Sequence, residues 1–303
     1  NGKSIDLSGY AVQFSKKETT AASEITWSSD DLDITDGKYV KPEKSGVYKL
    51  TATAGNKNKS IYVVSKAADE SEYVLYYNDF SGSMDGFSVI QKTSATVSVS
   101  DGELVLDASS STSSYARVLL PAFLGEFGDY KITAEGAIVA AKNTKRWTSL
   151  MFRVQSSDFP YYQLAVRQDA TLSNGVELAE RTAADAWNVR HTGSFSEKIS
   201  ASKKYTLTAD VHGNYAAAYI NGKKITDGTD FDGYRVGRIG FQANGCKATY
   251  DSIKVVLSDE APIPYPTELA KVKEIDTNII NSAAVVKEIR SSNDLTLLKD
   301  ARI

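Results

Sequence analysis

The sequence predicts an all-β protein in which two β-sandwich units follow one another along the chain. Short runs of alternating apolar and polar residues favour strands, because successive side chains of a strand point to opposite faces of a sheet. Glycine-containing turn signals separate these runs, and few prolines interrupt them. With 303 residues, of which 42% are hydrophobic, the chain is long enough for more than one domain with a buried core.

Two predicted hairpins illustrate the pattern. Near the N-terminus, the alternating runs Tyr48–Ala54 and Lys59–Val64 are separated by the turn signal Gly55–Asn58. Further along, the alternating run Tyr205–Val211 is followed by a turn and by a returning run that ends at Asn221-Gly222. This dipeptide predicts a type I′ turn, because both central residues of that turn need a positive φ.

The final predicted strand, Cys246–Leu257, contains an irregularity. Its apolar side chains alternate up to Tyr250 and then continue in the opposite phase from Ile253. A period of two cannot change phase without an extra residue, so we expect a β-bulge near Asp251 and Ser252.

Changes in composition divide the chain into segments. A polar stretch over Ser65–Glu72 lacks a strand pattern, and Pro262, Pro264 and Pro266 favour an extended linker. We therefore expect domains at residues 1–66 and 73–258, a proline-rich linker at 259–267, and a C-terminal extension at 268–303. The extension allows a capped helix and could begin another domain. We also expect that both ends were cut from a longer chain.

Composition argues against several classes of function. The 35 Lys and Arg residues against 38 Asp and Glu leave no positive excess to neutralise phosphates, so we expect no nucleic-acid partner. The single cysteine, Cys246, excludes an internal disulfide framework, and we expect it to be buried and inert. No apolar run reaches the roughly 18 residues of a membrane-spanning helix. We expect a monomer.

Three stretches near the N-terminus, Ile25–Asp30, Tyr39–Pro42 and Gly46–Gly55, resemble the bacterial Ig-like domains that are repeated in surface proteins. The resemblance implies a spacer domain with Trp27 in the core between two sheets.

A second resemblance covers residues 73–258. The matching stretches are Asn78–Phe80 with Gly86-Phe87, Met151–Val154, Tyr161-Tyr162, Tyr219–Ile225, Gly237–Gln242 and Tyr250–Val255. They resemble the concanavalin-A-like jelly rolls, the group that includes laminin-G-like modules and the 3-keto-disaccharide hydrolase domain. Lectins, adhesive modules and glycosidases all belong to this group, so the resemblance implies a fold without selecting one function.

Strand parity sorts the middle of this region into two faces. The inward set consists of Leu150, Phe152, Val154, Tyr162, Leu164, Val166, Val176 and Leu178. The opposite face then carries Met151, Arg153, Gln155, Tyr161, Gln163, Arg167, Glu177 and Arg181. Planar polar groups match the adjacent hydroxyls of a sugar, and an aromatic ring matches its C–H face. We therefore predict carbohydrate binding by Arg153, Gln155, Tyr161, Gln163, Arg167 and Glu177. A solvated face with cross-strand ion pairs, such as Arg167 with Glu177, is the alternative.

Trp147 and Trp187 are further candidates for sugar binding, because tryptophans near the rim of a sheet can stack on sugar rings. Trp147 follows the polar loop Lys142–Arg146, which favours an exposed platform. For Trp187 a position in the core is the favoured alternative.

Catalysis has less support. A glycosidase needs two carboxylates that flank the scissile bond. The nearest pair, Glu177 and Glu180, has a spacing of three, which places the two side chains on opposite faces of a regular strand.

The jelly-roll resemblance implies one metal. Modules of this group often hold a structural calcium ion between the first and last strands, and Asp79 and Asp251 occupy the matching strands. A turn-capping role is the alternative for Asp79.

The sequence as a whole favours a non-catalytic carbohydrate-recognition or adhesion module with an Ig-like spacer. We expect it to be part of a larger bacterial protein that is extracellular or attached to the cell wall. One alternative is an enzyme, either a glycoside hydrolase-like jelly roll or an accessory region of a hydrolase such as a glycerophosphodiester phosphodiesterase. A purely structural spacer is the other.

Overall fold

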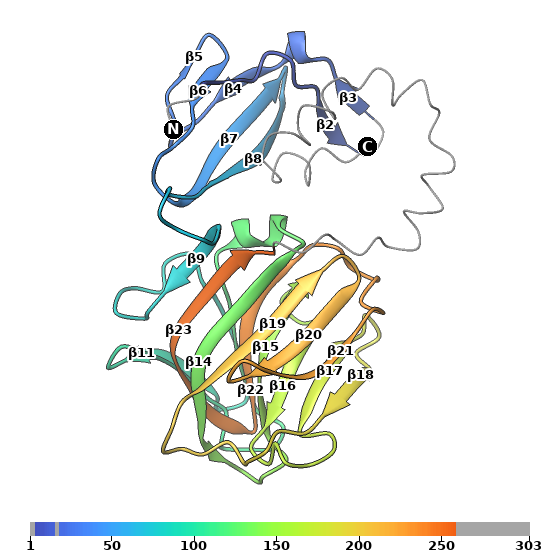
Figure 1. Ribbon diagram of the computed structural model, residues 1–303. Coiled ribbons are helices and arrows are strands. Elements are labelled where there is room, and N and C mark those ends of the chain that lie inside the picture. Colours follow the sequence, from blue (N-terminus) through green and yellow to red (C-terminus); the bar gives the residue numbers. More distant parts are fainter. Residues whose placement is uncertain (1–3, 16–17, 259–303) are drawn as a thin grey trace. The chain divides into compact units, whose positions relative to one another are not determined.

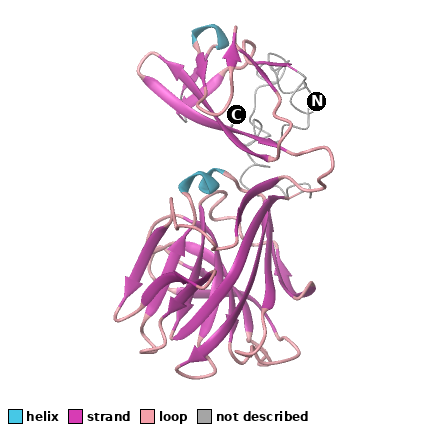
Figure 2. Ribbon diagram, turned by 90° about the vertical axis from the view of Figure 1, so that its left-hand side faces the viewer, coloured by secondary structure: helices cyan, strands magenta, loops and turns pink. Residues whose placement is uncertain are grey.

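The computed structural model describes residues 4–15 and 18–258. The predicted linker at 259–267 and the extension at 268–303 lie outside these residues. The chain divides between Leu75 and Tyr76 into two compact units, and strands dominate both (Figures 1 and 2). The prediction of an all-β fold is thus confirmed. Within the described part of the chain, no helix is both long enough and apolar enough to cross a membrane.

The first unit is built from short antiparallel strands in three small sheets. Sheet by sheet, the strands are β1 (Ser4–Asp6), β6 (Lys38–Val40) and β5 (Ile34–Thr35); β2 (Val12–Ser15) and β3 (Glu18–Thr20); and β4 (Thr26–Ser28), β7 (Gly46–Ala54) and β8 (Lys57–Ser65). Trp27 packs in the hydrophobic core of this unit with Tyr39 and Leu50. These pairings do not by themselves identify an Ig-like domain, which stays a prediction.

The second unit is a sandwich of two antiparallel sheets. The seven-stranded sheet has the order β10 (Ser88–Lys92), β13 (Tyr115–Leu119), β22 (Arg238–Asn244), β15 (Trp147–Val154), β16 (Tyr161–Arg167), β17 (Val176–Arg181) and β18 (Trp187–Gly193). The eight-stranded sheet has the order β11 (Thr96–Ser100), β12 (Glu103–Asp107), β23 (Cys246–Leu257), β14 (Tyr130–Ala141), β19 (Tyr205–His212), β20 (Tyr215–Ile220) and β21 (Lys223–Gly228), and β9 (Val74–Asn78) pairs with β23.

The hydrophobic core of the second unit lies between the two sheets. The ring of Phe241 on β22 lies 4.4 Å, centroid to centroid, from that of Tyr250 on β23. Leu150 is opposite Phe241 in the strand register, and the ring of Phe152 contacts that of Tyr162. The inward set is therefore as the alternation predicts, with the exception of Val154.

Two local predictions are confirmed by the backbone. Asn221 and Gly222 have φ values of 51° and 75°, as a type I′ turn requires. On β23, Ser252 is opposite Glu135 and Tyr250 is opposite Gly136, which leaves Asp251 as the extra residue of a β-bulge. A Cβ on Gly136 would lie 2.5 Å from the ring of Tyr250, so the sequence has glycine where the bulge brings the strands together.

A second β-bulge, which the sequence pattern does not predict, reverses the parity of β15. Met151 is opposite Gly240 and Val154 is opposite Arg238, so β15 has one residue more than β22 over this stretch. Arg153 has a φ of 51°, and its side chain is completely buried. Val154 instead packs with Met151 and other apolar residues on the outer face.

Because of this bulge, two residues that the sequence predicted to bind sugar, Arg153 and Gln155, contact the protein backbone instead. The guanidinium of Arg153 donates hydrogen bonds to the carbonyl oxygens of Phe231, Gly128 and Gly213 at 3.0, 2.9 and 2.7 Å. The Gln155 amide donates to the carbonyls of Arg153 and Val236 at 2.9 and 2.7 Å. Both side chains therefore stabilise the backbone, and neither lines the pocket described below.

Substitution of Arg153 tests this structural role. Arg153→Met should lower the free energy of unfolding by about 3–5 kcal/mol, because it leaves carbonyl groups and the neighbouring Asp129 buried without their cation. Denaturation in urea measures the change. Lys203→Met, which removes an exposed cation, is the control and should be nearly silent. A loss below about 1 kcal/mol for Arg153→Met would contradict the role.

Candidate functional site

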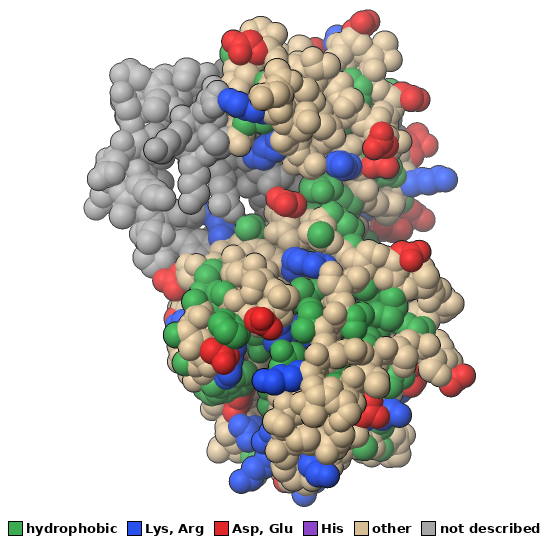
Figure 3. Space-filling model, turned by 180° about the vertical axis from the view of Figure 1, so that it is seen from behind, with side chains coloured by type: hydrophobic (Ala, Val, Ile, Leu, Met, Phe, Trp, Pro, Cys, Tyr) green, Lys and Arg blue, Asp and Glu red, His purple; other side chains and the backbone are tan. Residues whose placement is uncertain are grey.

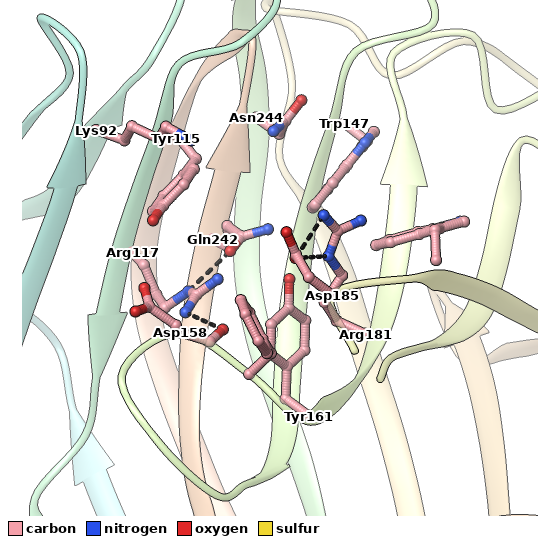
Figure 4. Close-up of a pocket in the computed structure, with 12 residues that line it drawn as sticks. Lys92, Tyr115, Arg117, Trp147, Asp158, Tyr161, Arg181, Asp185, Gln242 and Asn244 are labelled. Atoms are coloured by element: carbon pink, nitrogen blue, oxygen red, sulfur yellow. Dashed lines mark hydrogen bonds and ion pairs between the residues drawn. The ribbon is translucent and has the colours of Figure 1, made fainter. Parts of the chain in front are cut away.

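A pocket of about 340 Å³ opens on the outer face of the seven-stranded sheet, the face turned away from the other sheet (Figure 4). Its walls are formed by Lys92, Tyr115, Arg117, Trp147, Asp158, Phe159, Tyr161, Arg181, Asp185, Trp187, Gln242 and Asn244. The volume falls within the range of small-molecule sites, about 300–1,000 Å³. On the side of the molecule shown in Figure 3, hydrophobic side chains gather in patches with Lys and Arg among them.

Two tryptophans from different strands meet in this pocket. Trp147 begins β15 and Trp187 begins β18, and their ring centroids are 5.5 Å apart at an interplanar angle of 36°. Both side chains are half-buried. The favoured core position for Trp187 was thus the wrong alternative, because Trp187 lines the pocket. The two half-buried indoles in contact give one wall of the pocket an aromatic surface.

Arg117 organises the opposite side of the pocket. Its guanidinium lies between two aromatic rings, 5.2 Å from the centroid of Tyr115 and 4.8 Å from that of Tyr161. It donates to Oε1 of Gln242 at 2.8 Å and to the carbonyl oxygen of Asp158 at 2.7 Å, and also to the carbonyl of Ser157. These bonds fix the loop after β15 at the rim of the pocket.

The pocket also contains two carboxylates on separate loops. Asp185 accepts a hydrogen bond from Nε of Arg181 at 2.6 Å and forms an ion pair with the same guanidinium. Asp158 is exposed and belongs to the loop that Arg117 holds. Burial raises the pKa of Tyr161, although the positive charge of Arg117 opposes this shift. Its phenol therefore stays protonated near neutral pH and can donate a hydrogen bond.

The structure distributes the predicted sugar-binding residues over several places. Trp147, Tyr161 and Trp187 line the pocket. Arg167 and Glu177 form the cross-strand ion pair that the sequence offered as the alternative, with 2.6 Å between nitrogen and oxygen. Gln163 is completely buried on the same face as Tyr161.

Sequence reasoning missed most of the polar wall. It did not select Tyr115, Arg117, Gln242 and Asn244, which β13 and β22 contribute. The signal was the alternation of polar or aromatic residues with alanine on both strands. Which strands neighbour β15, however, depends on pairings between residues about a hundred positions apart, such as Ser149 with Gln242.

The predicted calcium ligands are both engaged by protein groups. Oδ1 of Asp79 accepts hydrogen bonds from the backbone N–H and the hydroxyl of Ser81, as a turn-capping carboxylate does. Asp251 forms an ion pair with Lys204 at 2.8 Å. Among the described residues, no cluster of three or more His, Cys, Asp or Glu is placed to hold a metal ion. Both carboxylates thus have protein partners, and the calcium ion stays a prediction. The predicted ion stays testable through the melting temperature with and without chelator, and an unchanged value would contradict it.

A second group of charged residues lies away from the pocket. Arg190 pairs with Glu180 at 2.6 Å, and Asp230 accepts a hydrogen bond from Nε2 of His191 at 2.8 Å. The next residue, Phe231, is completely buried against Phe152 and Tyr162. The group therefore fastens the loop that follows β21. Cys246 is also buried, which raises the pKa of its thiol to about 12 and makes it inert near neutral pH.

Comparisons with known proteins point to one family. The model of the 3-keto-alpha-glucoside-1,2-lyase-like domain matches residues 76–256. Similar solved structures include the carbohydrate-binding module CBM66 from Bacillus subtilis, with 17% identity, coverage of 55% of this chain and 91% of that chain, and a TM-score of 0.44. They also include the Bacillus licheniformis β-glucanase, with 14% identity, coverage of 60% and 97%, and a TM-score of 0.45. None of the curated proteins compared with the chain matches it.

The fastening role of Asp230 predicts a pH-dependent stability. Burial raises the pKa of Asp230, but the hydrogen bond and charge of His191 and the charge of Arg190 outweigh it, so the pKa is lowered overall. A lowered carboxyl pKa stabilises the fold above about pH 4, and this contribution is lost as the pH falls through the folded-state value. Because the Asp230 side chain is 47% exposed, the effect is below about 1 kcal/mol.

Asp230→Asn should therefore lower the free energy of unfolding slightly at pH 7, and the difference from the wild type should shrink below pH 4. Urea denaturation at several pH values measures both. Asp232→Asn, on the same loop and exposed, serves as the control. A difference that stays constant down to pH 3 would exclude the ion pair as its source.

Proposed function

The chain belongs to the 3-keto-alpha-glucoside-1,2-lyase-like domain family, and from this premise we propose that its second unit binds carbohydrate in the pocket on the outer face of the seven-stranded sheet. The observation that carries the proposal is the pair of half-buried indoles beside a wall of amide, guanidinium and phenol groups (Figure 4).

Each part of the pocket suits one part of a sugar. The C–H face of a pyranose packs on an aromatic ring, and Trp147 and Trp187 present such rings at the pocket wall. The hydroxyls need donors and acceptors in fixed positions, which amides such as those of Gln242 and Asn244 supply. Because Arg117 already holds Gln242 at 2.8 Å, this amide is oriented before a ligand arrives.

Binding without bond cleavage is the favoured form of this function. Glu177 and Glu180, the closest carboxylates along one strand, are each paired with an arginine, Arg167 and Arg190 respectively. Within the pocket, Asp185 is likewise paired with Arg181. These carboxylates are thus engaged by cations of the protein.

Bond cleavage is the second candidate function. The family is described as lyase-like, and Asp158 and Asp185 line the same pocket. A lyase needs a general base that removes a proton next to the carbon from which the leaving group departs, and glycoside hydrolysis uses two carboxylates on either side of the scissile bond. Detection of sugar released from a bound glycan distinguishes the two functions. Release that Asp158→Asn or Asp185→Asn abolishes would favour the enzyme, whereas saturable binding without release favours recognition.

The tryptophans provide the direct test. A glycan-array screen of the chain should identify a retained oligosaccharide, and Trp147→Ala and Trp187→Ala should each weaken its binding at least about tenfold. Loss of a stacked aromatic side chain costs about 1.5–3 kcal/mol, and about 1.4 kcal/mol corresponds to a factor of ten. Isothermal titration calorimetry measures the dissociation constants.

Tyr77→Ala is the matched control, because Tyr77 is an exposed aromatic side chain on β9, outside the pocket. Its affinity should equal that of the wild type. A silent array, or unchanged affinity in both tryptophan variants, would contradict the proposal and favour a structural spacer.

A further inference from the structure

Beneath the walls of the pocket, the outer face of the seven-stranded sheet continues as a floor. The register of β16 with both of its neighbours is regular from Tyr161 to Val166. Since Tyr161 lines the pocket, Gln163 and Ala165 point to the same face. By the same alternation, Ser149 shares the face of Trp147 on β15, and it lies opposite the pocket residue Gln242.

The tryptophan pair lies across this floor. Trp147 on β15 and Trp187 on β18 are separated by β16 and β17, and neighbouring strands lie roughly 4.8 Å apart. The two indoles can therefore meet at 5.5 Å only by leaning toward each other over the strands between them. Ala165 on β16 and Ala179 on β17 share the outer face between the two tryptophans, where their small side chains leave room above the strands.

The floor contains polar atoms that the protein leaves without partners. Gln163 and Ser149 are both completely buried. Neither the oxygen nor the nitrogen of the Gln163 amide has a hydrogen-bond partner, and the same holds for the hydroxyl of Ser149. A buried amide without hydrogen-bond partners destabilises the folded protein. Stability alone therefore does not explain why glutamine occupies this position.

Resting on the proposed function, we propose that Gln163 and Ser149 form a polar subsite at the base of the pocket that reads the hydroxyl groups of a neutral sugar. The Gln163 amide offers an acceptor and two donors, a set that matches two adjacent hydroxyls. The charged groups on the neighbouring strand, Glu177 and Arg181, are paired with Arg167 and Asp185. The charges next to Gln163 on β17 are therefore already paired, and the groups at the base that still lack partners are an amide and a hydroxyl, which suit a neutral sugar. The cations Lys92 and Arg117 lie in the walls of the pocket.

Access to the subsite requires a movement of the indoles. Both are only half-buried, so each can rotate toward solvent. When a sugar ring enters, the two indoles lose their contact with each other, and each packs on a face of the sugar instead. Its hydroxyls satisfy the amide of Gln163 at the same time. The free energy that the buried amide costs in the free protein is in this way recovered only in the complex.

The test compares stability and affinity in one variant. Gln163→Met keeps the length of the side chain and removes its polar atoms. Because these atoms have no partners in the free protein, the melting temperature should stay the same or rise. The affinity should fall at least tenfold. Calorimetric titrations of the full chain would use maltotriose, trehalose and cellotriose as neutral probes and trigalacturonate as a charged one.

Gln155→Met is the matched control, because the Gln155 amide donates to two backbone carbonyls outside the pocket. It should lower the melting temperature and leave the affinity unchanged. Ser149→Ala should behave like Gln163→Met with a smaller effect. An affinity within twofold of the wild type for Gln163→Met would overturn the subsite, as would a fall in its melting temperature like that of Gln155→Met.

The outcomes separate this inference from the proposed function. If Trp147→Ala abolishes binding but Gln163→Met does not, the pocket binds sugar and only the subsite is wrong. If the wild type binds trigalacturonate in preference to the neutral probes, the ligand class inferred for the subsite is wrong. If the wild type binds none of the probes, the inference fails for this set of sugars, and a silent glycan array would remove the proposed function as well.

Discussion

The sandwich of the second unit depends on one buried cation. The guanidinium of Arg153 extends from β15 of the seven-stranded sheet to the carbonyls of Gly128, just before β14, and of Gly213, in the turn between β19 and β20. A third bond goes to Phe231, whose ring fills the space beside Phe152 and Tyr162. One side chain thus joins both sheets and a closing loop. Any slip of β15 by one residue would carry this charge out of reach of its acceptors.

This constraint in the core also shapes the pocket on the opposite face. The bulge that turns Arg153 inward turns Val154 outward, where it packs with Leu119, Met151 and Tyr161. Tyr161 is in turn the ring on which Arg117 lies, and Arg117 holds the carbonyl of Asp158. The position of the pocket rim therefore follows from the bulge. Successive side chains of β15 point alternately to the core and to the pocket face, so a change in this one strand affects both.

The two bulges show what the sequence could and could not predict. In β23 the apolar phase changes visibly between Tyr250 and Ile253, and the extra residue at Asp251 follows from that pattern. In β15 the residues on both sides of Arg153 are apolar, and from Thr148 to Val154 the side chains of this strand are buried on both faces of the sheet. The alternation then carries no sign of the reversal. The pocket was predictable only in part for a related reason: Trp147 and Tyr161 lie on strands whose faces are sorted locally, whereas Arg117 reaches them through long-range pairing.

A sheet face that only needed to be soluble would expose its polar side chains, and one that only needed to pack would carry apolar ones. The outer face of the seven-stranded sheet does neither. It buries an amide and a hydroxyl that have no hydrogen-bond partners, on the same face as two half-buried indoles that contact each other. A stacking platform held from below loses little conformational freedom when a ligand arrives, and buried polar groups discriminate strongly between ligands that pair with them and ligands that do not. Buried polar groups without partners lower the stability of the free protein. The same groups can form hydrogen bonds with the hydroxyls of a sugar ring, so this face is better suited to recognition than to stability.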